Sequence, residues 1–102
     1  MKPEKLVLTR DLESMLISAE RYAVGRRTYI VSMTVDYLIC LLPKLSDWCV
    51  DILLRDMNDQ RDMVDRSGNF ELWGDDCDRR DWERFITALE KEMEKRKEAT
   101  PL

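Results

Sequence analysis

Carboxylates are the residues best able to do chemistry in this sequence, because the chain has 21 acidic residues and no histidine. The absence of histidine removes the commonest general base, the serine and cysteine triads and most zinc sites. Glycine-rich phosphate-binding motifs are missing as well. A paired-carboxylate hydrolase remains an alternative, although acids in a chain of 102 residues are usually solvated. We therefore expect a protein that acts by binding, not an enzyme, and no cofactor.

The acidic residues are concentrated in the middle of the chain. Residues 45–82 contain eleven acidic and five basic residues, a net charge of −6, whereas residues 1–44 have a net charge of +2. Carboxylates along one helix and the loop after it repel nucleic acid and attract basic surfaces, including the grooves of nucleic-acid-binding proteins. The alternative interpretation is a solvated face that keeps the protein soluble.

The acidic middle of the chain supplies the residues that we expect to contact a partner. Tryptophan is enriched at binding hot spots, so we include Trp73, which lies in the polar loop before the last helix, although such a residue can also fill a small core. The predicted contact residues are Asp51, Asp59, Asp62, Asp65, Trp73, Asp75 and Asp76.

Two groups of residues invite a metal-site interpretation. The stretch "DDCD", Asp75 to Asp78, offers oxygen ligands for calcium, but it lacks the alternating ligands and closing glutamate of a calcium-binding loop. We expect these acids at the positive end of the final helix, with Asp78 as its cap. The cysteines are spaced by 9 and 28 positions, which matches no close-set ligand pair and favours reduced thiols in a cytoplasmic protein without a metal site.

Helices are the elements that must position these acids. Apolar residues recur at spacings of three and four, which predicts helices over about 10–24, 29–42, 46–62 and 79–96. Thr9 and Ser46 suit helix caps, Gly25 suits a helix end and Pro43 disfavours continuation of the second helix. Residues 64–77 lack a helical pattern, and residues 97–102 should fray. The predicted fold is all-α: a compact four-helix array in a single domain, with an irregular acidic loop before the last helix.

The same spacing predicts which helix faces are buried. The second helix has two apolar stripes, one of which includes Met33 and Tyr37, so we expect neighbours on both of its sides. The longest wholly apolar run, Tyr37 to Leu42, is far shorter than the roughly 20 residues that cross a bilayer, so we expect no membrane segment. On the first helix, the predicted core stripe is Leu12, Met15, Leu16, Ala19, Tyr22 and Ala23.

Three stretches make residues 20–90 resemble small proteins carried by bacteriophages and mobile elements of Gram-positive bacteria: "RYAVGRRTYIVSMTVDYL", "LPKLSDWCVDILLRDM" and "DWERF". The resemblance rests on no catalytic motif and assigns no functional residues. It implies a genomic setting in which small acidic proteins often inhibit host defence. Anti-CRISPR proteins that occupy the nucleic-acid groove of a nuclease belong to that setting.

Charge and resemblance together predict an inhibitor. We expect it to bind a basic host protein that handles nucleic acids, specifically a CRISPR effector nuclease, in the cytoplasm of the host bacterial cell. We expect no direct contact with nucleic acid or with a membrane. The alternative is a phage regulatory or assembly factor that acts as a homo-oligomer or through DNA binding.

Overall fold

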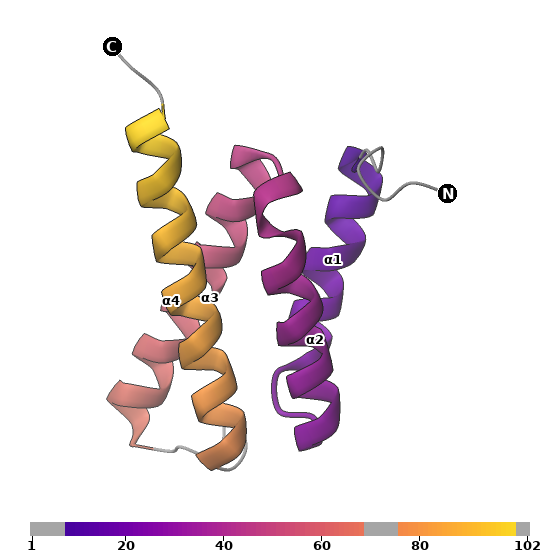
Figure 1. The fold of residues 1–102 in the computed structure, drawn as a ribbon. Coiled ribbons are helices and arrows are strands. Elements are labelled where there is room, and N and C mark those ends of the chain that lie inside the picture. The colour runs from indigo at the N-terminus through magenta and orange to yellow at the C-terminus, as the bar shows by residue number, and fades with distance from the viewer. Residues whose placement is uncertain (1–7, 69–75, 100–102) are drawn as a thin grey trace.

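The computed structural model describes residues 8–68 and 76–99, which form one all-α domain without a strand in that part of the chain (Figure 1). This confirms the predicted fold class. The elements are α1 (Arg10–Ala23), α2 (Thr28–Leu41), the short 3-10 helix η2 (Leu42–Lys44), α3 (Asp47–Ser67) and α4 (Asp76–Ala99).

The ends of α1 and α2 follow from local chemistry. The hydroxyl of Thr9 accepts a hydrogen bond from the backbone N–H of Leu12 at 3.2 Å and thereby caps α1. Gly25 lies just after the end of α1 with φ of +77°, a conformation that glycine enters without steric cost. The helix α2 ends at Leu41, and Pro43 lies in the tighter turn of η2.

The helix α3 is longer than its sequence pattern predicts. Ser46 caps its first turn by accepting a hydrogen bond from Cys49 N–H at 3.2 Å, and the helix continues to Ser67 instead of ending near residue 62. The extension buries Val64, seven residues after the buried Met57 and so on the same face. Gly68 ends the helix with φ of +67° and donates its N–H to the carbonyl of Val64 at 3.0 Å.

The start of α4 corrects one prediction. The helix begins at Asp76, so Asp78 lies inside its first turn and is not the residue that precedes the helix. Its side chain is buried. An acid in the first turn still faces the positive end of the helix dipole, which explains why "DDCD" has the composition of a helix start.

The helices pack around one core. The helix α4 lies against both α2 and α3, and α1 completes the array by packing against α2 and α3 (Figure 1). The helix α2 does contact neighbours on two sides, as predicted, but it does so through the stripe of Val31, Val35 and Leu38 and not through Met33 and Tyr37. The core is formed by Ile17, Ala23, Val31, Val35, Leu38, Leu42, Leu45, Cys49, Val50, Leu53, Met57, Val64, Trp82, Phe85, Ile86 and Leu89.

The predicted core stripe of α1 is wrong for four of its six residues, whereas Ala23 is buried and Leu16 is partly buried against the core. The buried residues of α1 are Glu13, Ile17, Glu20 and Ala23. Four members of the predicted stripe are exposed: Leu12, Met15, Ala19 and Tyr22. On α2, Met33 and Tyr37 are exposed as well, and the side that faces the core carries Val31, Val35 and Leu38. The fold therefore buries two glutamates of α1 and leaves large apolar side chains of α1 and α2 in contact with solvent.

Side chains of α1 and α4 hold the segment that joins α2 to α3. The buried carboxylate of Glu13 accepts hydrogen bonds from the backbone N–H and the hydroxyl of Ser46, at 2.6 and 2.7 Å. From α4, the Arg96 guanidinium donates to the carbonyls of Leu42 and Leu45 at 2.8 and 2.7 Å and pairs with Asp47 at 2.7 Å. The charged side chains of Glu13 and Arg96 thus hydrogen-bond backbone atoms between α2 and α3, where the regular hydrogen bonds of these helices end.

Replacing Arg96 by methionine keeps a long side chain but removes the donors to Leu42 and Leu45. Hydrogen bonds to charged groups contribute about 1.5–3 kcal/mol each, so we expect the free energy of unfolding in urea to fall by about 3 kcal/mol. The matched control is Arg55→Met, because Arg55 pairs with Asp51 at 2.7 Å on the surface. The control should cost less than about 0.5 kcal/mol. Equal losses in the two variants would show that Arg96 is only another surface charge.

Candidate functional site

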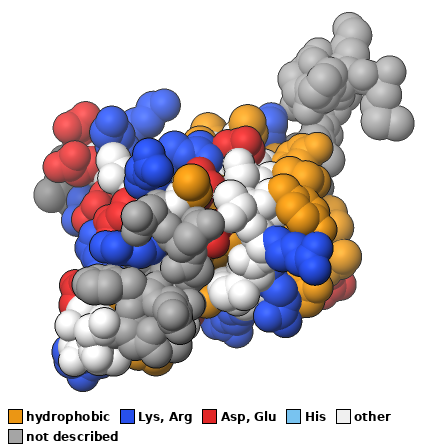
Figure 2. Space-filling model, turned by 90° about the horizontal axis from the view of Figure 1, so that it is seen from below, with side chains coloured by type: hydrophobic (Ala, Val, Ile, Leu, Met, Phe, Trp, Pro, Cys, Tyr) orange, Lys and Arg blue, Asp and Glu red, His pale blue; other side chains and the backbone are white. Residues whose placement is uncertain are grey.

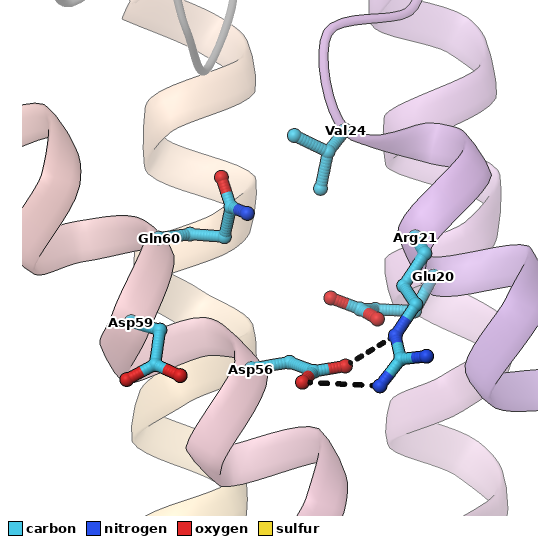
Figure 3. A pocket seen from close by; sticks show the side chains of 6 residues that line it. All are labelled: Glu20, Arg21, Val24, Asp56, Asp59 and Gln60. Atoms are coloured by element: carbon cyan, nitrogen blue, oxygen red, sulfur yellow. Dashed lines mark hydrogen bonds and ion pairs between the residues drawn. The ribbon is translucent and has the colours of Figure 1, made fainter.

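A pocket of about 300 Å³ lies between α1 and α3 (Figure 3). It is lined by Glu20 and Arg21 of α1, by Val24 directly after α1, and by Asp56, Asp59 and Gln60 of α3. Three of these six residues are acidic and one is basic, so we call it the acidic pocket. The close-up shows the Glu20 carboxylate directed from α1 toward the space in front of α3, where Asp56 approaches it.

Glu20 is the buried titratable group of the acidic pocket. The residue is only 1% exposed, and its Oε2 atom has no hydrogen-bond partner among the described residues. Burial, followed by the negative charge of Asp56, raises the pKa of Glu20 to about 8, which outweighs the opposing effect of Arg21. Glu20 is therefore protonated at neutral pH.

Arg21 and Asp56 close the front of the acidic pocket. The Arg21 guanidinium donates to both carboxylate oxygens of Asp56, from Nε at 2.8 Å and from Nη2 at 3.3 Å (Figure 3). This pairing raises the pKa of Arg21 further above its usual value. The Arg21 side chain is 62% exposed, so water competes for the pair and the guanidinium is free to move.

Two neighbouring carboxyl groups, one of them protonated, also occur in acid–base enzymes. In those enzymes the acid reaches a substrate, whereas Glu20 is only 1% exposed. The arrangement is suited to holding a positively charged group near Glu20 and Asp56, because such a group favours loss of the Glu20 proton.

The four predicted contact residues that lie on α3 are all exposed: Asp51, Asp59, Asp62 and Asp65. Their spacing places them along one side of the helix. We call these four residues the acidic side of α3. Asp59 also lines the acidic pocket, so the pocket lies at the edge of the acidic side. Trp73 and Asp75 lie outside the described residues, and Asp76 is the first residue of α4, with a side chain outside the described part.

Sequence reasoning missed Glu20, Arg21 and Asp56. The signal that could have found them is the spacing of Glu13, Ile17, Glu20 and Val24, which lie on one face of α1 at steps of three and four. A glutamate that shares a face with Ile17 and Val24 is buried if that face is buried. The stripe through Leu12, Met15 and Tyr22 is more apolar, so an analysis of apolar spacing selects that face of α1 instead.

Other chemistry is sparse in the described residues. Across residues 8–68 and 76–99, no group of three or more histidine, cysteine or acidic side chains is arranged to hold a metal ion. Burial, followed by the charge of Glu13, raises the pKa of the Cys49 thiol to about 11, so it stays protonated and unreactive. Cys40 and Cys77 are exposed. None of the helices in these ranges is both long and apolar enough to cross a bilayer.

Comparisons with protein-family models, with curated proteins and with solved structures found no match. The arguments about function therefore rest on the geometry of the acidic pocket, on the acidic side of α3 and on the exposed apolar residues.

The raised pKa of Glu20 makes stability depend on pH. The unfolded chain loses this proton near pH 4.5, whereas the folded protein keeps it up to about pH 8. Unfolding releases a proton between these values, so the free energy of unfolding should fall as pH rises from 4.5 to 8. Glu20→Gln keeps the size of the side chain and cannot ionise. In urea denaturation at pH 8 we expect this variant to be more stable than the wild type by roughly 2 kcal/mol or more.

The control for this comparison is Glu98→Gln, which removes an exposed carboxylate from α4 and should leave the pH profile unchanged. A wild-type profile that stays flat from pH 5 to pH 8 would contradict the assignment of a buried, protonated Glu20.

Proposed function

We propose that this protein is a non-enzymatic inhibitor that binds a basic, nucleic-acid-handling protein of a bacterial host, specifically a CRISPR effector nuclease, in the cytoplasm. A phage or mobile-element origin is part of the proposal. Its support is the resemblance of residues 20–90 together with the charge of α3. That helix has six acidic and three basic residues, a net charge of −3.

The observation that carries the proposal is the exposure of the acidic side of α3. Asp51 is the one of its four carboxylates that forms a salt bridge within the helix, with Arg55 at 2.7 Å. Carboxylates on one helix are held at a defined spacing. They therefore attract an approaching basic surface and favour one orientation of it. The same charges repel phosphates, which disfavours direct binding of DNA through α3.

The acidic pocket adds a concave feature at the edge of the acidic side. Interfaces gain affinity from a few groups that fill pockets, whereas rim charges act mainly on association rate. The acidic side of α3 therefore serves to attract the partner, and the pocket serves to anchor one of its side chains.

The triple variant Asp51→Asn, Asp62→Asn and Asp65→Asn tests the acidic side without altering the pocket. In biolayer interferometry with a panel of purified CRISPR effector nucleases, we expect the wild type to bind and to block cleavage of target DNA. The triple variant should associate about tenfold more slowly at low salt, with a weaker dependence on salt, because steering by exposed charges is lost. Its helical content should match the wild type, since exposed carboxylates contribute little to stability.

A matched variant, Glu90→Gln, Glu94→Gln and Glu98→Gln, makes the same charge change on the exposed side of α4. It should bind like the wild type. Equal slowing of association in both triple variants would show that the effect depends on net charge alone. Absence of inhibition across the panel would refute the proposal. A clear shift of bare DNA in an electrophoretic assay at physiological salt would favour the alternative, DNA-binding regulator.

A second candidate function, assembly as a homo-oligomer, is favoured by the exposed apolar residues. Tyr29, Met33 and Tyr37 follow one another at four-residue steps on α2, and each is more than half exposed. Figure 2 shows hydrophobic side chains gathered on the side of the molecule where α1 lies. Tyrosine and methionine are enriched at protein interfaces, and an exposed apolar patch of this kind often marks one. The occupant in this case is the same face of a second copy.

Met33→Glu places a charge in the middle of the exposed apolar residues of α2. If α2 pairs with a second copy, sedimentation velocity at tens of micromolar should show a wild-type dimer and a monomeric Met33→Glu variant, because a buried unpaired carboxylate opposes association. Met63→Glu, an exposed methionine of α3, serves as the control and should not change the sedimentation. A wild type that sediments as a monomer would exclude this second candidate at that concentration.

A further inference from the structure

We propose that the acidic pocket is the binding site for one lysine ammonium group of the partner, held between Glu20 and the carboxylates of Asp56 and Asp59. The inference rests on the proposed binding of a basic protein and names the side chain that the protein recognises. Its basis is the buried Glu20 carboxyl, whose Oε2 has no hydrogen-bond partner in the described structure and which is directed into the pocket (Figure 3).

The acceptors of the pocket suit an ammonium group. Oε2 of Glu20 is unpartnered, Asp59 supplies exposed carboxylate oxygens, and the side chain of Gln60 supplies an amide oxygen. These acceptors come from the two helices that border the pocket. An ammonium has three rotatable donors and adapts to such a set.

A guanidinium fits the same acceptors less well. Arginine binds best when two of its parallel N–H groups meet the two oxygens of one carboxylate. In this pocket that position is taken, because Arg21 already donates to both oxygens of Asp56. Val24 also lines the pocket, where it can contact the methylene groups of a lysine side chain. The pocket thus offers an apolar side chain to the methylene groups of a lysine and oxygen acceptors to its ammonium group.

The ammonium enters the space of about 300 Å³ that is present while Arg21 pairs with Asp56. Arg21 keeps both of its bonds to Asp56, so the position that a guanidinium would need stays taken.

Binding of the ammonium should release a proton. The charged groups around Glu20 are Arg21 on α1 and Asp56 and Asp59 on α3. From α2, the one charged residue is Asp36, and it pairs with Arg84 of α4 at 2.8 Å. An ammonium beside the protonated Glu20 carboxyl favours the carboxylate, so the Glu20 proton leaves to solvent and the ammonium keeps its own three protons. Charge is balanced: one cation enters and one proton departs.

The test uses three synthetic peptides of nine residues that alternate arginine and glycine and differ only at the central position: lysine, arginine or norleucine. Norleucine keeps the methylene stem and lacks the ammonium. Isothermal titration calorimetry at pH 7 should give about tenfold tighter binding for central lysine than for norleucine or arginine. Titrations in buffers of different ionisation enthalpy should show release of about one proton for the lysine peptide alone.

Glu20→Gln should abolish both the preference for lysine and the proton release, with circular dichroism confirming that the variant is folded. Glu94→Gln, the matched control on α4, should keep both. Equal affinity of the three peptides for the wild type, or a lysine preference that survives in Glu20→Gln, overturns the pocket assignment.

The arginine–glycine frame separates this inference from the proposed function. Salt-sensitive binding of the norleucine peptide reports attraction of a basic chain by the acidic side of α3, whereas the difference between lysine and norleucine reports the pocket. Absence of binding by all three peptides overturns the pocket together with the proposed attraction of basic partners. Binding of all three without a lysine preference overturns the pocket alone.

Discussion

The fold depends on charged side chains that hydrogen-bond the backbone between α2 and α3. Glu13 reaches this segment from α1 through Ser46, and Arg96 reaches it from α4 through Leu42 and Leu45. Glu13 can do so only if its face of α1 turns inward. Glu20, two helical turns further along, is then buried as well, since residues seven apart share a helix face. The bond that positions α3 thus also creates the buried carboxyl of the acidic pocket.

Much of the fold could be predicted because local chemistry sets the helix ends. Thr9 and Ser46 cap the helices that they were expected to cap, and Gly25 lies at a helix end. The orientation of α1 could not be predicted from its own apolar pattern. That pattern places Met15 and Tyr22 inside, but the hydrogen bonds of Glu13 to a distant segment decide the rotation, and a long-range pairing of this kind leaves no periodic signal in the sequence.

The candidate site was predictable in part for a similar reason. Exposed acids such as Asp62 and Asp65 could be recognised because charge that recurs on one side of a polar helix stays in solvent. The partnership of Glu20 with Asp56 joins residues 36 positions apart, so only the packing of α1 on α3 brings it about. Burial then changes the chemistry of Glu20 from a charged surface group to a neutral acid, which its residue type alone does not indicate.

The modest charge density of α3 has a consequence for competition with nucleic acid. Its 21 residues span about 31 Å and carry a net charge of −3. Over that length a DNA duplex carries about 18 phosphates, with a layer of condensed counterions that a basic protein releases on binding. Binding of a basic surface to α3 would release far fewer counterions, because α3 carries much less charge than the DNA. If the proposed partner binds DNA and α3 through the same basic surface, added salt should therefore weaken the DNA complex much more than the complex with α3.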